Sequence, residues 1–168
     1  MMLVLGVDPG SNGTGYGLVE GRDRHLAYID SGVIHLPQRL SFHQRIHRIF
    51  QSLVDIMGDH RPVEMALEDL FYAKNAKSAL KLGHARGAVV VASVQCHVPI
   101  FEYTPLEIKK STVGYGRASK EQVRSMVCRI LGIDRELPLD ASDALATAIC
   151  HLNCSLFAAT RKAVRGNP

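Results

Sequence analysis

The chain has 168 residues, enough for one hydrophobic core and too few for two ordinary domains, so we expect one domain over residues 1–158 and a basic, flexible tail over 159–168. Hydrophobic residues make up 46% and charged residues 21%, and no apolar stretch of about 18 residues is present that would span a membrane. The N-terminus has no signal-peptide pattern, so we expect a cytoplasmic location. The net charge of +4 is a weak indication of a polyanionic partner.

The apolar run at residues 2–7 predicts a strand in the middle of a sheet. The strand ends in Asp8, which Pro9 and Gly10 follow. Such an Asp either begins a turn, which Pro9 and Gly10 favour, or faces a cation, because an unpaired carboxylate at the end of a buried strand is costly. Two segments rich in β-favouring residues follow, and the short turn between them predicts an antiparallel three-strand meander. These segments are residues 14–20 and 25–36.

Helices and strands then alternate along the chain. Ser41, with Gln44 three residues later, predicts the capped start of an amphipathic helix. A strand with alternating apolar residues ends in Glu68 and so repeats the arrangement found at Asp8. The predicted elements of this part are, in order, a helix at 42–57, a strand at 63–68, a helix at 75–95 and a strand at 99–103.

The helix predicted at 75–95 combines glycines with a row of basic residues. Gly83 and Gly87 each lower the helix propensity by about 1 kcal/mol relative to Ala, so we expect another backbone to approach closely at this helix. That backbone could belong to the sheet or to a second subunit. Lys74, Lys77 and Lys81 form a basic stripe on another side.

The C-terminal third contains a basic segment and an acidic pair. Residues 109–129 contain six Lys and Arg and a single acid, which indicates either a solvated face or a contact with phosphates. Asp140 and Asp143 precede an alanine-rich stretch at 144–156 that predicts a buried helix. Acids at this place also serve as N-cap and first-turn groups, with Asp140 as the cap.

Four acids thus stand at the ends of apolar elements: Asp8, Glu68, Asp140 and Asp143. They converge if the strands of Asp8 and Glu68 are adjacent and parallel and the last helix begins at the same edge of the sheet. Clustered carboxylates repel one another, so we expect bound cations, and all-oxygen ligands favour Mg²⁺ or Mn²⁺. Two such ions about 4 Å apart support phosphodiester hydrolysis. The basic segment would then hold a nucleic-acid backbone beside the site.

Four segments carry a resemblance that runs through most of the chain. They are Val7 to Gly17, Glu68 with residues 71–83, Val113 to Gly116 before Lys120, and Asp140 to Ala146. These segments are similar to the RuvC family of Holliday-junction resolvases, and the second is the most specific. The resemblance implies an α/β, ribonuclease H-like fold. Its central mixed sheet would have five strands, a three-strand antiparallel meander plus two parallel strands, and would be flanked by helices.

The resemblance also implies a homodimeric endonuclease that cuts four-way DNA junctions symmetrically, in homologous recombination and DNA repair. It implies two Mg²⁺ ions per site, which Mn²⁺ could replace, and a branch-migration complex of RuvA and RuvB as partner. By similarity, the metal-binding catalytic acids are Asp8, Glu68, Asp140 and Asp143, and Lys120 acts beside the scissile phosphate. Some relatives carry His where this chain has Asp140. The residues expected to contact DNA are Phe71, Lys74, Lys77, Lys81, Arg86, Lys109, Arg117 and Lys120.

The sequence is also compatible with several alternatives. Phe71 either stacks on an unpaired base or packs in the core, and Asp69 should face away from the acids by strand alternation. The chain could be a ribonuclease H-like nuclease for another branched substrate, or a junction-binding module without catalysis. An actin-like or sugar-kinase ATPase has a similar opening, but such proteins need two domains of this kind, and 168 residues supply one.

Overall fold

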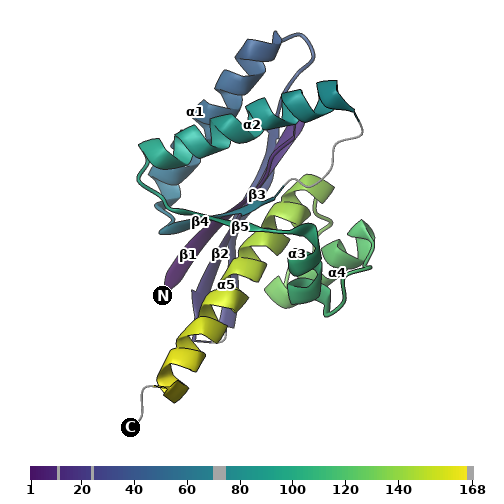
Figure 1. The fold of residues 1–168 in the computed structure, drawn as a ribbon. Coiled ribbons are helices and arrows are strands. Elements are labelled where there is room, and N and C mark those ends of the chain that lie inside the picture. The colour runs from purple at the N-terminus through teal and green to yellow at the C-terminus, as the bar shows by residue number, and fades with distance from the viewer. Residues whose placement is uncertain (11, 24, 70–74, 166–168) are drawn as a thin grey trace.

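The computed structural model describes residues 1–10, 12–23, 25–69 and 75–165, and Figure 1 shows a central sheet with helices on both faces. The five strands are β1 (Met2–Asp8), β2 (Gly13–Arg22), β3 (His25–His35), β4 (Glu64–Glu68) and β5 (Ile100–Tyr103). Their order in the sheet is β3-β2-β1-β4-β5. β1, β2 and β3 pair antiparallel, whereas β4 pairs parallel with β1 and with β5. The predicted meander with two parallel strands is confirmed.

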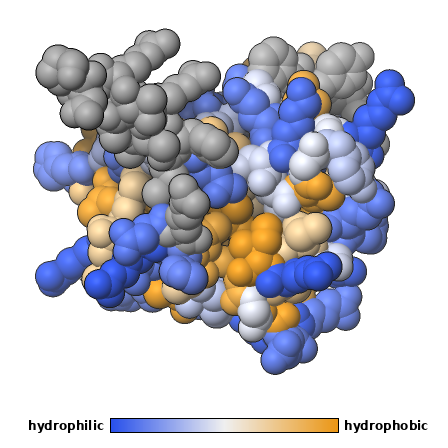
Figure 2. Space-filling view, turned by 90° about the horizontal axis from the view of Figure 1, so that it is seen from below, coloured by the Kyte–Doolittle hydropathy of each residue, from blue (hydrophilic) through white to orange (hydrophobic). Residues whose placement is uncertain are grey.

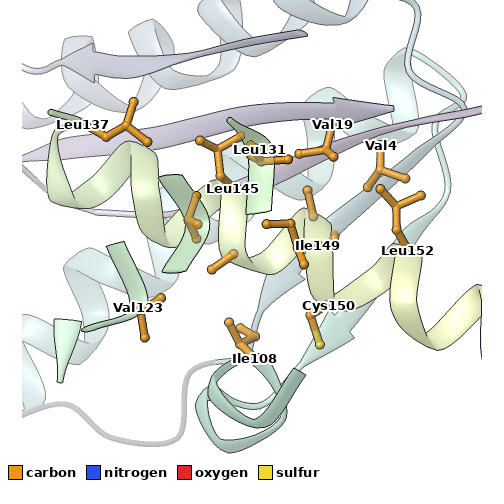
Figure 3. Close-up of a cluster of buried hydrophobic side chains, with 14 of the residues drawn as sticks. Val4, Val19, Ile108, Val123, Leu131, Leu137, Leu145, Ile149, Cys150 and Leu152 are labelled. Carbon is orange, nitrogen blue, oxygen red and sulfur yellow. The ribbon is translucent and has the colours of Figure 1, made fainter. Parts of the chain in front are cut away.

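Five helices flank the sheet in two layers. They are α1 (Phe42–His60), α2 (Ala76–Gln95), α3 (Pro105–Val113), α4 (Lys120–Leu131) and α5 (Leu139–Arg165). α1 and α2 cover one face, and α5 runs along the other face with α3 and α4 beside it (Figure 1). Each face has its own buried cluster of apolar side chains. Figure 3 shows the cluster on the α5 face, where Val4 and Val19 of the sheet lie near Leu145, Ile149 and Leu152 of α5.

Glycines in β1 and β2 allow α5 to lie directly on the sheet. A Cβ at Gly6 would lie 1.9 Å from the carbonyl oxygen of Ala144, and one at Gly15 would lie 1.9 Å from that of Asp140. Carbon and oxygen atoms cannot approach so closely, so a side chain at either position would push α5 away from the sheet. The position of α5 relative to β1 and β2 therefore depends on the absence of these two side chains.

A polar contact fixes α5 farther along its length. His151 of α5 is 1% exposed and lies 2.5 Å from Glu64 Oε2 through its Nε2 atom. Its Nδ1 atom is 2.7 Å from the hydroxyl of Tyr103. Because Glu64 begins β4 and Tyr103 ends β5, this one side chain connects the helix to both parallel strands.

Two helix boundaries differ from the prediction. α5 begins at Leu139, so Asp140 is a residue of its first turn and not its N-cap. The helix continues to Arg165, so the tail expected at 159–168 begins within it.

α4 was not predicted as a separate element, although Ser119 and Gln122 form a capping box at its start and Gly132 ends it in a left-handed conformation.

The surface combines polar side chains with scattered apolar ones. The face in Figure 2 has hydrophobic residues in its middle and hydrophilic residues around them. In the described part of the chain, no helix is both long enough and apolar enough to cross a membrane.

Candidate active site

Strand alternation directs Asp8 and Glu68 to the face of the sheet that α5 covers. Val7 and Leu67 are paired in the parallel register of β1 and β4, and both side chains belong to the cluster under α1 and α2. The next residue of each strand points to the opposite face. Asp8 and Glu68 therefore lie side by side at the carboxyl ends of adjacent parallel strands, facing the start of α5.

The first turn of α5 brings Asp140 and Asp143 to this edge. Gly15 of β2 is the antiparallel partner of Asp8, and the main chain of Asp140 lies directly over it. The Asp140 carboxylate lies beside Gly13, with Oδ2 3.3 Å from the place where a Cβ of Gly13 would be. Asp143 follows one helical turn later and is 14% exposed. The tertiary arrangement assumed from the sequence is the observed one.

Lys120 enters the site from the start of α4. Its ammonium group donates to Asp143 Oδ2 over 2.5 Å. A depression of about 220 Å³ is lined by Glu68, Lys109, Lys120 and Asp143, together with Pro105, Ile108 and Val123. Two lysines and two carboxylates thus line one concave surface. Such a surface can hold a phosphate group beside acidic residues.

Burial and neighbouring charges raise the pKa values of two of the acids, Asp8 and Glu68. The pKa of Asp8 is raised to about 8, first by burial and then by the charges of Glu68 and Asp143, while Lys120 opposes the rise. Asp140 contributes a smaller increase. Burial also raises the pKa of Glu68, Asp143 adds to the effect, and Lys120 and Lys109 oppose it. The charges of the other three carboxylates thus all act on Asp8, which places them close enough to influence one site.

The chemistry of the donors fits a hard divalent cation. The four carboxylates offer only oxygen atoms, which is the ligand type that Mg²⁺ and Mn²⁺ prefer. A cation between them would offset the repulsion that raises the pKa values of Asp8 and Glu68. Within residues 1–10, 12–23, 25–69 and 75–165, however, no three His, Cys, Asp or Glu side chains already form a group that could hold one ion. The acids therefore share an edge of the sheet without forming a closed ligand shell among these residues.

The residues expected to contact DNA occupy several places. Lys77 and Lys81 are exposed near the start of α2, and Arg117 is exposed between α3 and α4. Lys109 and Lys120 line the depression described above. Phe71 and Lys74 lie outside the described residues.

Arg86 lies elsewhere than expected. Its guanidinium group points into the protein, where it donates to the Glu68 carbonyl oxygen and to Glu102, both over 2.6 Å. Asp69 lies 3.8 Å away, on the same side of the sheet as α2, so it faces away from the acids as strand alternation predicted. With its donors engaged in this way, Arg86 is a poor candidate for the predicted contact with the DNA backbone.

Sequence reasoning did not identify the function of Gly15 or the intramolecular role of Arg86. The glycine-rich run before Gly17 was a visible signal, but it gave no indication that a helix 125 residues later would lie over Gly15. Arg86 was visible as a charge, yet its partners at Glu68 and Glu102 lie 18 and 16 residues away in the sequence. Neither separation along the sequence lies within a single helix or strand, so no local periodicity indicates these contacts.

Comparison with known proteins gives a consistent result. The sequence matches the profile of the family described as "Crossover junction endodeoxyribonuclease RuvC" over residues 4–151. A protein of that name from Geobacter metallireducens is 49% identical over 152 residues, which cover 90% of this chain and 93% of the relative. One from Geobacter sulfurreducens is 45% identical over 164 residues, or 98% of this chain and 100% of the relative.

Solved structures agree with the sequence relatives. The structure described as RuvC of Thermus thermophilus in complex with Holliday junction substrate has a TM-score of 0.87 and 32% identity, and the match covers 94% of this chain and 97% of that one. The yeast mitochondrial Holliday junction resolvase Ydc2, with a TM-score of 0.64 and 14% identity, shares the fold. The fold is therefore ribonuclease H-like, as expected, and the chain belongs to the RuvC family of crossover junction endodeoxyribonucleases.

Proposed function

We propose that this protein resolves four-way DNA junctions by paired, symmetrical hydrolysis of two phosphodiester bonds, and so acts in homologous recombination and DNA repair. One observation carries the proposal: Asp8, Glu68 and Asp143 interact with one another and with Lys120 at a single edge of the sheet, in a member of a nuclease family. The Thermus relative described with a Holliday junction substrate supports the choice of substrate.

We infer that Asp8, Glu68, Asp140 and Asp143 hold divalent cations, and that these are two Mg²⁺ ions for which Mn²⁺ can substitute. When bound, such ions lower the pKa of a water molecule and stabilise the charge that develops on the phosphate. Lys120 places a positive charge at Asp143, where it can also bind a phosphate oxygen. Lys109 adds a second positive charge on the wall of the same depression.

The basic residues around the site would follow the DNA backbone. Lys77, Lys81 and Arg117 are exposed, and phosphate contacts by such groups supply most of the salt-dependent affinity for DNA. We retain Phe71 and Lys74 as predicted contacts, with Phe71 stacking on a base at the crossover. Arg86 is not retained, because its guanidinium is bonded within the protein.

The functional unit we propose is a homodimer formed through α2. In the described part of the chain, a Cβ at Gly83 or Gly87 would have nothing within 4 Å, so the sheet is not the backbone that these glycines accommodate. They lie instead in an open apolar groove between α1 and α2, whose lining includes Ile46, Phe50 and the exposed Leu80. A second copy fits this groove because a two-fold dimer would present two identical sites to the two-fold symmetric junction.

Other parts of the proposal follow from the family. Branch migration by RuvA and RuvB would deliver junctions to the enzyme, and the protein would act in the cytoplasm, where the chromosome of a bacterial cell lies.

The test uses a labelled four-way junction and a duplex of the same sequence, each incubated with Mg²⁺ or with chelator. We expect paired, symmetrical nicks in the junction with Mg²⁺ and no cutting in the other three mixtures. Asp8→Asn should bind the junction like the wild type but should not cut it, because a neutral amide binds Mg²⁺ poorly. Equal cutting of the duplex would contradict the substrate, and a rate for Asp8→Asn close to that of the wild type would contradict the assigned site.

A further inference from the structure

Arg86 joins the layer of α2 to the strand end that carries Glu68. Its side chain is 17% exposed. One guanidinium nitrogen, Nη1, donates to the main-chain carbonyl of Glu68, and Nη2 donates to Glu102 Oε1 on β5. The two contacts come from the fork of one planar group, which a Lys cannot reproduce.

The position of Glu68 makes the first of these contacts informative. Glu68 is the last residue of β4, and its side chain points to the α5 face while its carbonyl is reached from the α2 face. The amide of Asp69 then bonds to the Tyr103 carbonyl of β5 over 2.8 Å. The peptide that follows the Glu68 side chain is therefore fixed on both sides, by Arg86 at its oxygen and by Tyr103 at its nitrogen.

The charges around Arg86 support the same interpretation. Glu102 and Asp69 lie behind the strand end, on the side opposite the active-site acids. The guanidinium group lies between these two acids and the Glu68 main chain, so its positive charge faces two carboxylates close to the end of β4. Arg86 therefore has partners that account for its conformation without any DNA.

We propose that Arg86 is a positioning residue for catalysis, which holds the main chain of Glu68 so that its carboxylate faces Asp8 and Asp143. The inference rests on the proposed function, because it assigns Arg86 to the orientation of one of the proposed metal ligands. It replaces the expected phosphate contact with an intramolecular role. Displacement of a catalytic group by about 1 Å can lower a rate by about a hundredfold.

The test compares Arg86→Lys and Arg86→Gln with two matched controls. Arg117→Gln removes an exposed arginine expected to bind DNA, and Arg22→Gln removes one at the far end of β2 from the site. Single-turnover cleavage at saturating enzyme, junction affinity at several salt concentrations, and the rise in unfolding temperature on adding Mg²⁺ are measured for each variant. Circular dichroism shows whether each variant is folded, and Arg86→Lys is the milder change should Arg86→Gln unfold.

We expect Arg86→Lys to cut at least about tenfold more slowly than the wild type, with unchanged junction affinity and a smaller rise in unfolding temperature with Mg²⁺. Arg117→Gln should weaken binding and reduce its salt dependence, and Arg22→Gln should change nothing. A full cleavage rate for Arg86→Lys would overturn the inference. Weakened binding with a lower salt dependence in Arg86→Gln, at an unchanged saturated rate, would do so too and would restore the DNA contact. Failure of the wild type to cut the junction would instead contradict the proposed function.

Discussion

Gly15→Ala should inactivate the enzyme without changing any acid. The new Cβ would lie 1.9 Å from the Asp140 carbonyl oxygen and 2.3 Å from its carbon, whereas ordinary contact begins at 3.4 Å. The gap between β2 and the first turn of α5 must therefore widen by about 1.5 Å, the difference between 3.4 and 1.9 Å. Both obstructing atoms are main-chain atoms, so no side-chain rotation can relieve the clash.

The shift would move Asp140 and Asp143 away from Asp8 and Glu68. At about a hundredfold for each ångström of displacement, we expect a loss of at least 100-fold in the single-turnover rate with Mg²⁺. Overpacking should also lower the free energy of unfolding by about 1–3 kcal/mol. Junction affinity should change little, because none of the expected DNA contacts lies on β2.

Two further glycine variants separate the causes of this loss. Gly21→Ala clashes with the end of the Leu152 side chain, which is flexible and lies far along α5 from the acids, so it should lower stability and leave the rate near that of the wild type. Gly58→Ala has open space around its Cβ and should raise stability by up to about 1 kcal/mol. The reasoning is refuted if Gly15→Ala is folded and cuts at the wild-type rate. It is also refuted if Gly21→Ala loses as much of its cleavage rate as Gly15→Ala does.

Three other predictions concern charge and assembly. Lys120→Met should lower the cleavage rate about 10- to 100-fold at saturating enzyme, in addition to a modest loss of junction affinity from the missing phosphate contact. An unchanged rate at saturating enzyme would exclude Lys120 from the reaction. The pKa of Asp8 is raised from 3.8 to about 8 in the folded protein, so the folded state binds the Asp8 proton more tightly than the unfolded state does. In the presence of chelator, the free energy of unfolding should therefore fall by several kcal/mol as the pH rises from about 4 to 8. Asp8→Asn should flatten this fall in denaturant titrations, and an equal slope in both proteins would contradict the assignment. Gly83→Ala should raise the monomer's unfolding temperature but weaken the dimer in sedimentation, whereas an unaffected dimer would place the interface elsewhere.

Much of this fold could be predicted, because the local pattern of apolar and polar residues shows where the central strands end and which face of the sheet their side chains occupy. The apolar run before Asp8 and the alternation before Glu68 identified two central strands and the direction of their last side chains, since a period of two fixes the face. Ser41 and Gln44 likewise identified the start of α1, where the capping box is present. The same signal is present at Ser119 and Gln122, but the basic residues around it indicate a charged surface as readily as the start of a helix.

The remaining features depend on contacts between distant parts of the chain. The sequence suggested that another backbone approaches Gly83 and Gly87, but it did not tell whether that backbone belongs to the sheet or to a second subunit. Within the described residues, the structure excludes the sheet. Arg86 belongs to a row of basic residues on α2, and nothing in that row distinguishes a side chain that reaches Glu102 from one that reaches solvent. The role of Lys120 came from the family resemblance, because its partner Asp143 is 23 residues away.

The long helix α5 is at once part of the hydrophobic core and the carrier of two acids. Leu145, Ile149 and Leu152 are at most 2% exposed, and His151 anchors the same helix to β4 and β5. The opening of a helix buried in this way costs a free energy close to that of unfolding the whole domain. On heating, we therefore expect activity to be lost in the same transition as the tertiary structure.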